Sequence, residues 1–170
     1  MSPEIHEWLA WALVAPFPLA LVWAMTTDLA RFEIPNRIPI FLGCTYLVAS
    51  LSLGEDLLII LRQCGIGAAF LLVGMLLFWR GIMGGGDVKL LAACVPWLAP
   101  TQLPAFLFWM AMIGGILGLV ALGVRRMPLP AKLAEHPWMK TFRGTDKIPY
   151  GLAIGCAGLI TLPHLPLLAN

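Results

Sequence analysis

Charged residues are scarce in this chain of 170 residues: Asp, Glu, Lys and Arg together make up 12% of it, against 60% for hydrophobic residues. A soluble domain of this size needs far more polar surface to cover itself, so the composition excludes that class. The mean hydropathy of +0.88 instead predicts an integral membrane protein.

Several sequence signals are also missing. The N-terminus lacks the basic region and small-residue cleavage site of a secretory signal peptide, so we expect the first apolar run to be retained. The four cysteines form no Cys-x-x-Cys pair, and the three histidines are too scattered to form a metal cluster. We therefore predict no disulfide framework, no metal and no cofactor. The chain also has no internal repeat and no long linker, which predicts a single membrane-embedded domain over residues 1–170.

Long apolar runs dominate what is present. A helix needs about 20 apolar residues to cross a hydrocarbon core of about 30 Å. This length predicts an all-α polytopic membrane protein, a bundle of six transmembrane helices over Trp8–Thr27, Ile38–Leu53, Leu57–Trp79, Val88–Pro100, Leu103–Val124 and Pro149–Leu168. The fourth segment is short for a span, which leaves a re-entrant hairpin as the alternative. Trp97, at its end, is predicted to be an interfacial anchor.

The basic residues predict the orientation of these helices. Ten of the eleven lie after the first, third and fifth segments: Arg31, Arg37, Arg80, Lys89, Arg125, Arg126, Lys132, Lys140, Arg143 and Lys147. The turns on the opposite side carry no Lys or Arg. By the positive-inside rule, both termini are periplasmic and the loop Arg125–Lys147 is cytoplasmic. If the fourth segment did not cross, the six basic residues after the fifth would face outward, so the crossing is favoured.

Two of the nine acidic residues, Asp28 and Asp87, lie directly against membrane segments, and both fall on the predicted cytoplasmic side. Asp87 follows the glycine run Gly81–Gly86, where a restarting helix presents it at the N-terminal end. Two close carboxyl groups can share a proton, one ionised and one protonated, as peptide hydrolysis by paired aspartates requires. The alternatives are that Asp87 caps the helix and that Asp28 is a solvated acid at a helix end. Glu33 is a loop acid with no assigned role.

Three motifs carry a resemblance to a known family. Gly84-Gly85-Gly86-Asp87 fits the Gly-x-Gly-Asp signature of membrane aspartyl proteases, and its continuation Val88-Lys89-Leu90-Leu91 resembles the bacterial type IV prepilin peptidases. The segment from Asp28 to Ile34-Pro35-Asn36 is similar to that family's first aspartate motif. Ile148-Pro149-Tyr150-Gly151 resembles the start of its last helix. Together, in this order, the motifs are far more specific than any one alone.

The resemblance implies a function. In that family the two motif aspartates are catalytic, which implies catalysis by Asp28 and Asp87, with Gly84, Gly86, Lys89, Pro35 and Asn36 shaping the site. It implies an aspartyl endopeptidase of the bacterial inner membrane that removes the short basic leader of prepilins or pseudopilins at the cytoplasmic face, just before the pilin's hydrophobic helix. With only Met1–Glu7 before its first span, the chain looks like the small Flp/Tad-type (TadV/CpaA-like) member, without methyltransferase activity.

The expected partners are thus a prepilin helix and membrane lipid, and no nucleic acid. An alternative function is a small transporter or pilus-assembly subunit that uses the two aspartates for proton relay or partner contact. The absence of other acids deep in the spans disfavours a proton relay across the bilayer.

Overall fold

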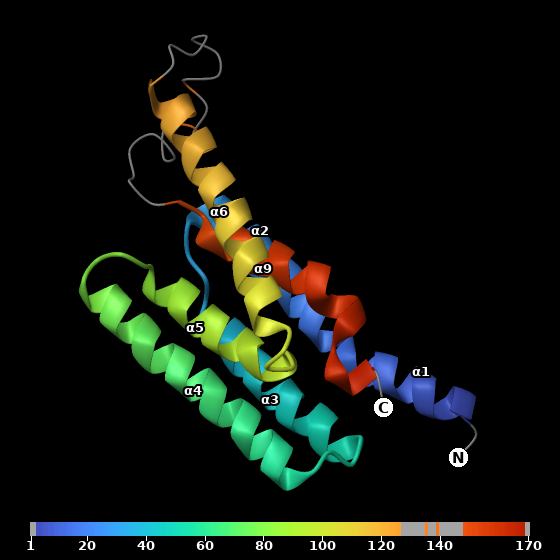
Figure 1. The fold of residues 1–170 in the computed structure, drawn as a ribbon. Coiled ribbons are helices and arrows are strands. Elements are labelled where there is room, and N and C mark those ends of the chain that lie inside the picture. Colours follow the sequence, from blue (N-terminus) through green and yellow to red (C-terminus); the bar gives the residue numbers. More distant parts are fainter. Residues whose placement is uncertain (1–2, 127–134, 136–138, 140–147, 169–170) are drawn as a thin grey trace.

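The computed structural model describes residues 3–126, 135, 139 and 148–168, and over these residues it is all-α, with no strand. Figure 1 shows a bundle of elongated helices. The α-helices are α1 (Pro3–Val14), α2 (Pro16–Arg31), α3 (Arg37–Ser52), α4 (Leu57–Trp79), α5 (Gly85–Cys94), α6 (Leu103–Arg126) and α9 (Tyr150–Thr161). The 3-10 helices are η1 (Val95–Trp97), η2 (Leu162–His164) and η3 (Pro166–Leu168).

Four helical stretches are long and apolar enough to cross a membrane: Glu7–Arg31, Leu57–Trp79, Leu103–Arg126 and Tyr150–Leu168. They coincide with the first, third, fifth and sixth predicted spans. The second corresponds to α3, whose 16 residues measure roughly 24 Å at 1.5 Å per residue. The fourth corresponds to α5 and η1, which together measure only about 20 Å. The described residues therefore provide four full-length spans and two shorter helical segments.

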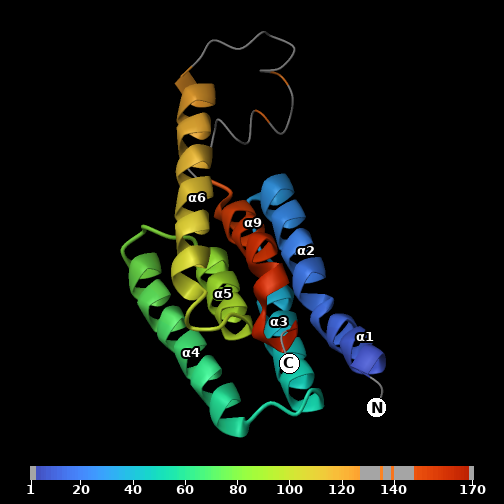
Figure 2. The same cartoon turned by 45° about the vertical axis from the view of Figure 1, so that its right-hand side comes forward.

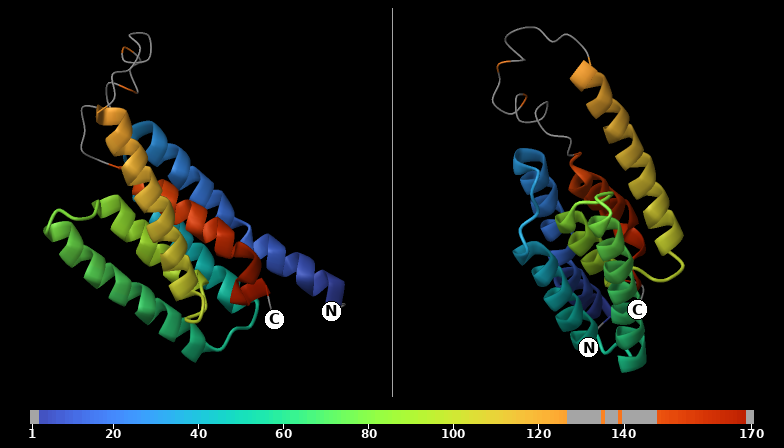
Figure 3. Two further views of the ribbon diagram at one scale, coloured as in Figure 1. Left: turned by 45° about the horizontal axis from the view of Figure 1, so that its top comes forward. Right: turned by 90° about the vertical axis from the view of Figure 1, so that its left-hand side faces the viewer.

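Helix α9 occupies the middle of the bundle, between α2 and α6, in all the views of Figures 1, 2 and 3. In an apolar window of 18 residues, half of the Tyr150–Leu168 stretch is buried, against 17% for Leu103–Arg126. Glycines permit this central position, because a Cβ at Gly155 or Gly158 would overlap Met25 or Leu21 on α2. Small residues of this kind let membrane helices approach closely.

Helix α5 connects the two halves of the bundle by packing against α3, α4 and α9. Its contact with α4 also depends on glycine: a Cβ at Gly74 would lie 2.5 Å from Val88 Cγ1, and one at Gly67 would lie 3.0 Å from the Ala92 carbonyl oxygen. The start of α5 is thereby held at a fixed position between its neighbours.

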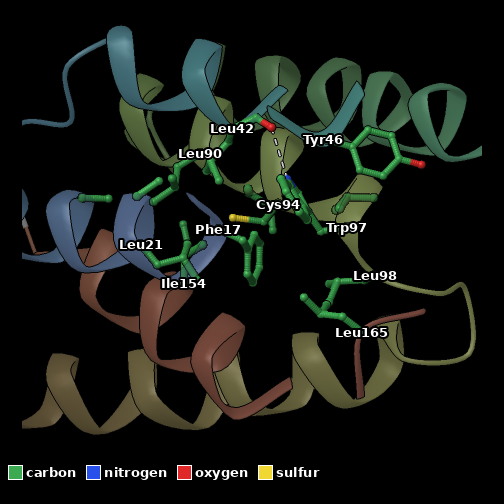
Figure 4. Packing of buried hydrophobic residues seen from close by; sticks show 14 of the residues in the cluster. Phe17, Leu21, Leu42, Tyr46, Leu90, Cys94, Trp97, Leu98, Ile154 and Leu165 are labelled. Atoms are coloured by element: carbon green, nitrogen blue, oxygen red, sulfur yellow. Dashed lines mark hydrogen bonds between the residues drawn. The ribbon is translucent and has the colours of Figure 1, made fainter. Parts of the chain in front are cut away.

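Trp97 lies in the core, as Figure 4 shows, so the prediction of an interfacial anchor is wrong. It is fully buried, its Nε1 donates a hydrogen bond of 3.2 Å to the Leu42 carbonyl oxygen, and its ring packs 5.1 Å from that of Phe17 and 5.7 Å from that of Tyr46. Trp97 lies in η1, directly after the short α5, and its indole reaches a backbone acceptor inside the bundle instead of the lipid headgroups.

The helices alternate in direction. The C-terminal ends of α2, α4 and α6 and the N-terminal ends of α3, α5 and α9 point toward one end of the bundle, and both ends of the described chain lie toward the other (Figures 1 and 2). The predicted cytoplasmic loop Arg125–Lys147 falls almost entirely outside the described residues.

Candidate active site

Asp28 lies in the last turn of α2 and is 4% exposed. The helix ends just after it at Phe32, whose backbone is left-handed (φ 54°) and whose N–H donates a 2.8 Å hydrogen bond to the Asp28 carbonyl oxygen. This conformation costs on the order of 1 kcal/mol for a residue other than glycine. Burial of the Phe32 ring in a small cluster with Ala121 and Ile148 offsets that cost. The chain therefore turns back sharply beside Asp28.

The returning chain places Ile34 against two glycines. A Cβ on Gly86, at the start of α5, would lie 3.1 Å from Ile34 Cβ, and one on Gly151, at the start of α9, would lie 2.8 Å from Ile34 Cδ1. Ile34 precedes Pro35, which restricts it to extended backbone. It thus acts as a buried spacer between the two helix starts that flank the aspartates.

The glycine run before Asp87 forms the turn from α4 into α5. Gly81 has a left-handed backbone (φ 71°), Gly84 is the N-cap residue of α5, and Asp87 lies in the first turn. The prediction that a restarting helix presents Asp87 at its N-terminal end is confirmed, although the helix begins at Gly85, within the glycine run and not after it. A Cβ on Gly84 would lie 2.6 Å from Asp87 Oδ2, so any side chain there would displace the carboxyl group.

The start of α9 contributes a direct contact with Asp28. The backbone N–H of Gly151 donates a 2.7 Å hydrogen bond to Asp28 Oδ2. The first N–H groups of a helix have no partner within the helix, and the helix dipole is positive at this end. A carboxyl group is therefore held in a fixed orientation at the N-terminus of α9.

Asp28 and Asp87 line the same cavity of about 800 Å³, between the end of α2, the Gly81–Gly86 turn and the start of α9. Of the residues expected to shape the site, Gly84 and Gly86 also line it. Pro35, Asn36 and Lys89 do not. Asn36 and Lys89 nevertheless lie together, since Lys89 Nζ donates a 2.9 Å hydrogen bond to Asn36 Oδ1 and so connects the starts of α5 and α3.

The structure adds residues that the sequence did not place in the site, among them Glu33, Ile34, Tyr150 and Gly151. The match of residues 148–151 to a family motif was the available signal for Tyr150 and Gly151. Glu33 is a lining residue and not simply a loop acid, so Asp28, Glu33 and Asp87 face one cavity. The described residues that line it include these three acids and no Lys or Arg. Among the described residues, no group of three His, Cys, Asp or Glu side chains is arranged to hold a metal ion.

Fold and site together define a multi-pass, all-α membrane protein in which two aspartates from distant segments face one cavity. Residues 15–119 match the type IV leader peptidase family, and because this covers more than half of the chain, the protein belongs to that family. It is accordingly a peptidase that acts on prepilins, and it does so in a membrane. No curated protein and no solved structure matches the chain.

Proposed function

We propose that this protein is a membrane aspartyl endopeptidase of the Flp/Tad type, a single domain over residues 1–170, that cleaves the leader of prepilins or pseudopilins at the cytoplasmic face of the bacterial inner membrane. Asp28 and Asp87 are its catalytic residues. The observation that supports this most strongly is that both carboxyl-bearing side chains line one cavity, although they are 59 residues apart in the matched region.

The chemistry needs one ionised and one protonated carboxyl group. The ionised group takes a proton from water as the water oxygen attacks the scissile carbonyl carbon, while the protonated group donates its proton to the carbonyl oxygen. In the tetrahedral intermediate the roles reverse: one group protonates the leaving nitrogen, the C–N bond breaks, and the other recovers a proton from a hydroxyl. The pair ends as it began, and no cofactor is consumed.

The acidic lining supports a basic leader as the bound part of the substrate. Asp28, Glu33 and Asp87 provide carboxyl groups, and the cavity lies at the end of the bundle where Arg31, Arg37 and Arg80 also lie. By the positive-inside rule that end is cytoplasmic and the termini are periplasmic. In this arrangement the four long spans and the two shorter segments, α3 and α5, form a bundle of six. The site lies where α5 begins, close to the cytoplasmic surface of the membrane.

Co-expression with candidate prepilins tests the proposal. Flp-type prepilins should lose their leaders, as measured by the mass of the mature pilin, and a variant carrying both Asp28→Asn and Asp87→Asn should leave them intact at equal membrane levels. Processing by that double variant would refute the aspartyl mechanism. If only prepilins outside the Flp class were processed, the substrate assignment would be refuted, but the aspartyl mechanism would not.

A further inference from the structure

A second cavity lies beside the candidate active site. It is a groove of about 470 Å³ between α3, α4 and α5, and its walls are mainly apolar. We call it the α3–α5 groove and define it by Asn36, Gly43, Cys64, Ala68, Lys89 and Pro96. The chemistry proposed above does not use it.

The groove and the catalytic cavity are both bordered by the start of α5 and by the segment that leads into α3. Asn36 and Lys89, joined by their 2.9 Å hydrogen bond, form its polar head. Each is two residues from a residue that lines the catalytic cavity, Ile34 in one case and Asp87 in the other. On α5, side chains two residues apart point about 200° from each other, so the catalytic cavity and the groove lie on different sides of the start of this helix. A chain that passes over the Asn36–Lys89 pair runs from one to the other.

The remainder of the groove has the length and the apolar surface that are needed to bind a helix. Asn36 and Gly43 are seven residues apart along α3, which corresponds to roughly 10 Å, or two helical turns. Gly43 and Ala68 carry almost no side chain, and a Cβ built on Gly43 would meet nothing within 4 Å. Small residues on a membrane helix allow a second helix to approach closely.

We propose that the α3–α5 groove binds the first two turns of the substrate's apolar helix, directly after the scissile bond. This inference rests on the proposed function and specifies how that site positions its substrate. Charge fixes the direction: the Lys89 ammonium group repels a basic leader from the groove, while the carboxyl groups of Asp28, Glu33 and Asp87 attract it into the catalytic cavity. The scissile bond then lies between the two.

Native Cys64 allows a direct test, because it lines the groove whereas Cys156 lies on α9, outside it. The full-length protein with Asp87→Asn is prepared in two forms, one keeping only Cys64 and one keeping only Cys156. Each is co-expressed in membranes with a prepilin that carries one cysteine, moved through the first eight residues after the cleavage site. Oxidation should cross-link the Cys64 form at positions three or four residues apart. Cross-linking of the Cys156 form instead, or of neither form although the prepilin co-purifies, overturns the proposal.

A matched pair of glycine substitutions gives a kinetic test. Gly43→Leu fills the groove, whereas Gly65→Leu adds the same side chain to α4 outside it; neither position has an atom within 4 Å of an ideal Cβ. Gly43→Leu should raise KM for a full-length prepilin roughly tenfold, with kcat retained, and Gly65→Leu should change neither. Equal KM values in the two variants overturn the groove assignment. Failure of the proposed function is recognised separately, since Asp28→Asn and Asp87→Asn would then still cleave.

Discussion

Gly151 and Asp28, which are 123 residues apart in the chain, are joined by a 2.7 Å hydrogen bond from the Gly151 N–H to Asp28 Oδ2. The contact requires glycine as well as the N–H group. An ideal Cβ on Gly151 would lie 2.8 Å from that same oxygen and 3.0 Å from Asp28 Cγ. The start of the last helix therefore fixes the first aspartate in place.

Gly151→Ala should lower kcat by about 10²-fold, because the added methyl group must push the Asp28 carboxyl group aside and catalysis falls steeply when a reacting group moves by about 1 Å. Gly115→Ala on α6 is the control, since its Cβ would have no neighbour within 4 Å. Both variants are purified and assayed for prepilin cleavage at equal protein concentration. Unchanged kcat in Gly151→Ala would show that catalysis does not require the position in which Gly151 holds the Asp28 carboxyl group.

Glu33→Gln should raise KM for a prepilin with a basic leader several-fold and leave kcat within about twofold, since Glu33 lines the cavity but has no role in proton transfer. The effect should shrink in high salt, which screens exposed charges. The measurement compares wild-type and variant proteins on two substrates, the natural leader and one with its Lys and Arg replaced by Gln. An equal rise in KM for both substrates would argue against charge recognition.

Gly74→Ala should destabilise the protein by about 1–3 kcal/mol, because its Cβ would lie 2.5 Å from Val88 Cγ1, next to Asp87. Val88→Ala removes the clashing methyl groups, so the double variant should recover most of the stability and activity lost in Gly74→Ala. Thermal unfolding in detergent and cleavage rates are measured for both single variants and the double variant. Additive losses would mean that the two side chains do not meet.

A topology measurement tests the cytoplasmic placement of the site. In a protein without native cysteines, Ala134→Cys should react with a membrane-impermeant thiol reagent only after the membrane is opened, because the loop between Arg125 and Lys147 holds much of the basic charge. A cysteine at Glu7, near the opposite end of the bundle, should react in intact spheroplasts. The reverse pattern would move the aspartates to the periplasmic side.

Local sequence patterns predicted the long helices well. The segment Leu57–Trp79 coincides with α4 residue for residue, because its run of apolar side chains lies between the helix-capping Asp56 and the turn at Gly81. The glycine run likewise predicted the helix start that presents Asp87. Such features depend on neighbours in the chain, which a sequence displays directly.

Contacts between distant segments could not be predicted in this way. Nothing near Gly151 in the sequence indicates that its N–H meets Asp28, and nothing near Ile34 indicates two glycines packed against it. Trp97 illustrates the same limit: an indole suits a membrane interface, but the short α5 carries it into the core, where Leu42 provides its hydrogen-bond acceptor. Whether a tryptophan lies at the membrane interface or in the core therefore depends on tertiary packing and not on the residue type alone.

Whether Asp28 and Asp87 form the catalytic pair is tested by measuring kcat for prepilin cleavage by purified Asp28→Asn and Asp87→Asn, with Glu7→Gln as the control at an exposed position. Asn has the shape of Asp, and at position 28 it retains an oxygen that can accept the Gly151 hydrogen bond, so both variants should remain folded. Asn cannot take a proton from water or donate an acidic one. Each aspartate variant should lose at least about 10³-fold in kcat, while Glu7→Gln keeps full activity. A folded single variant that retained more than about a tenth of the wild-type kcat would contradict the assignment of the catalytic pair.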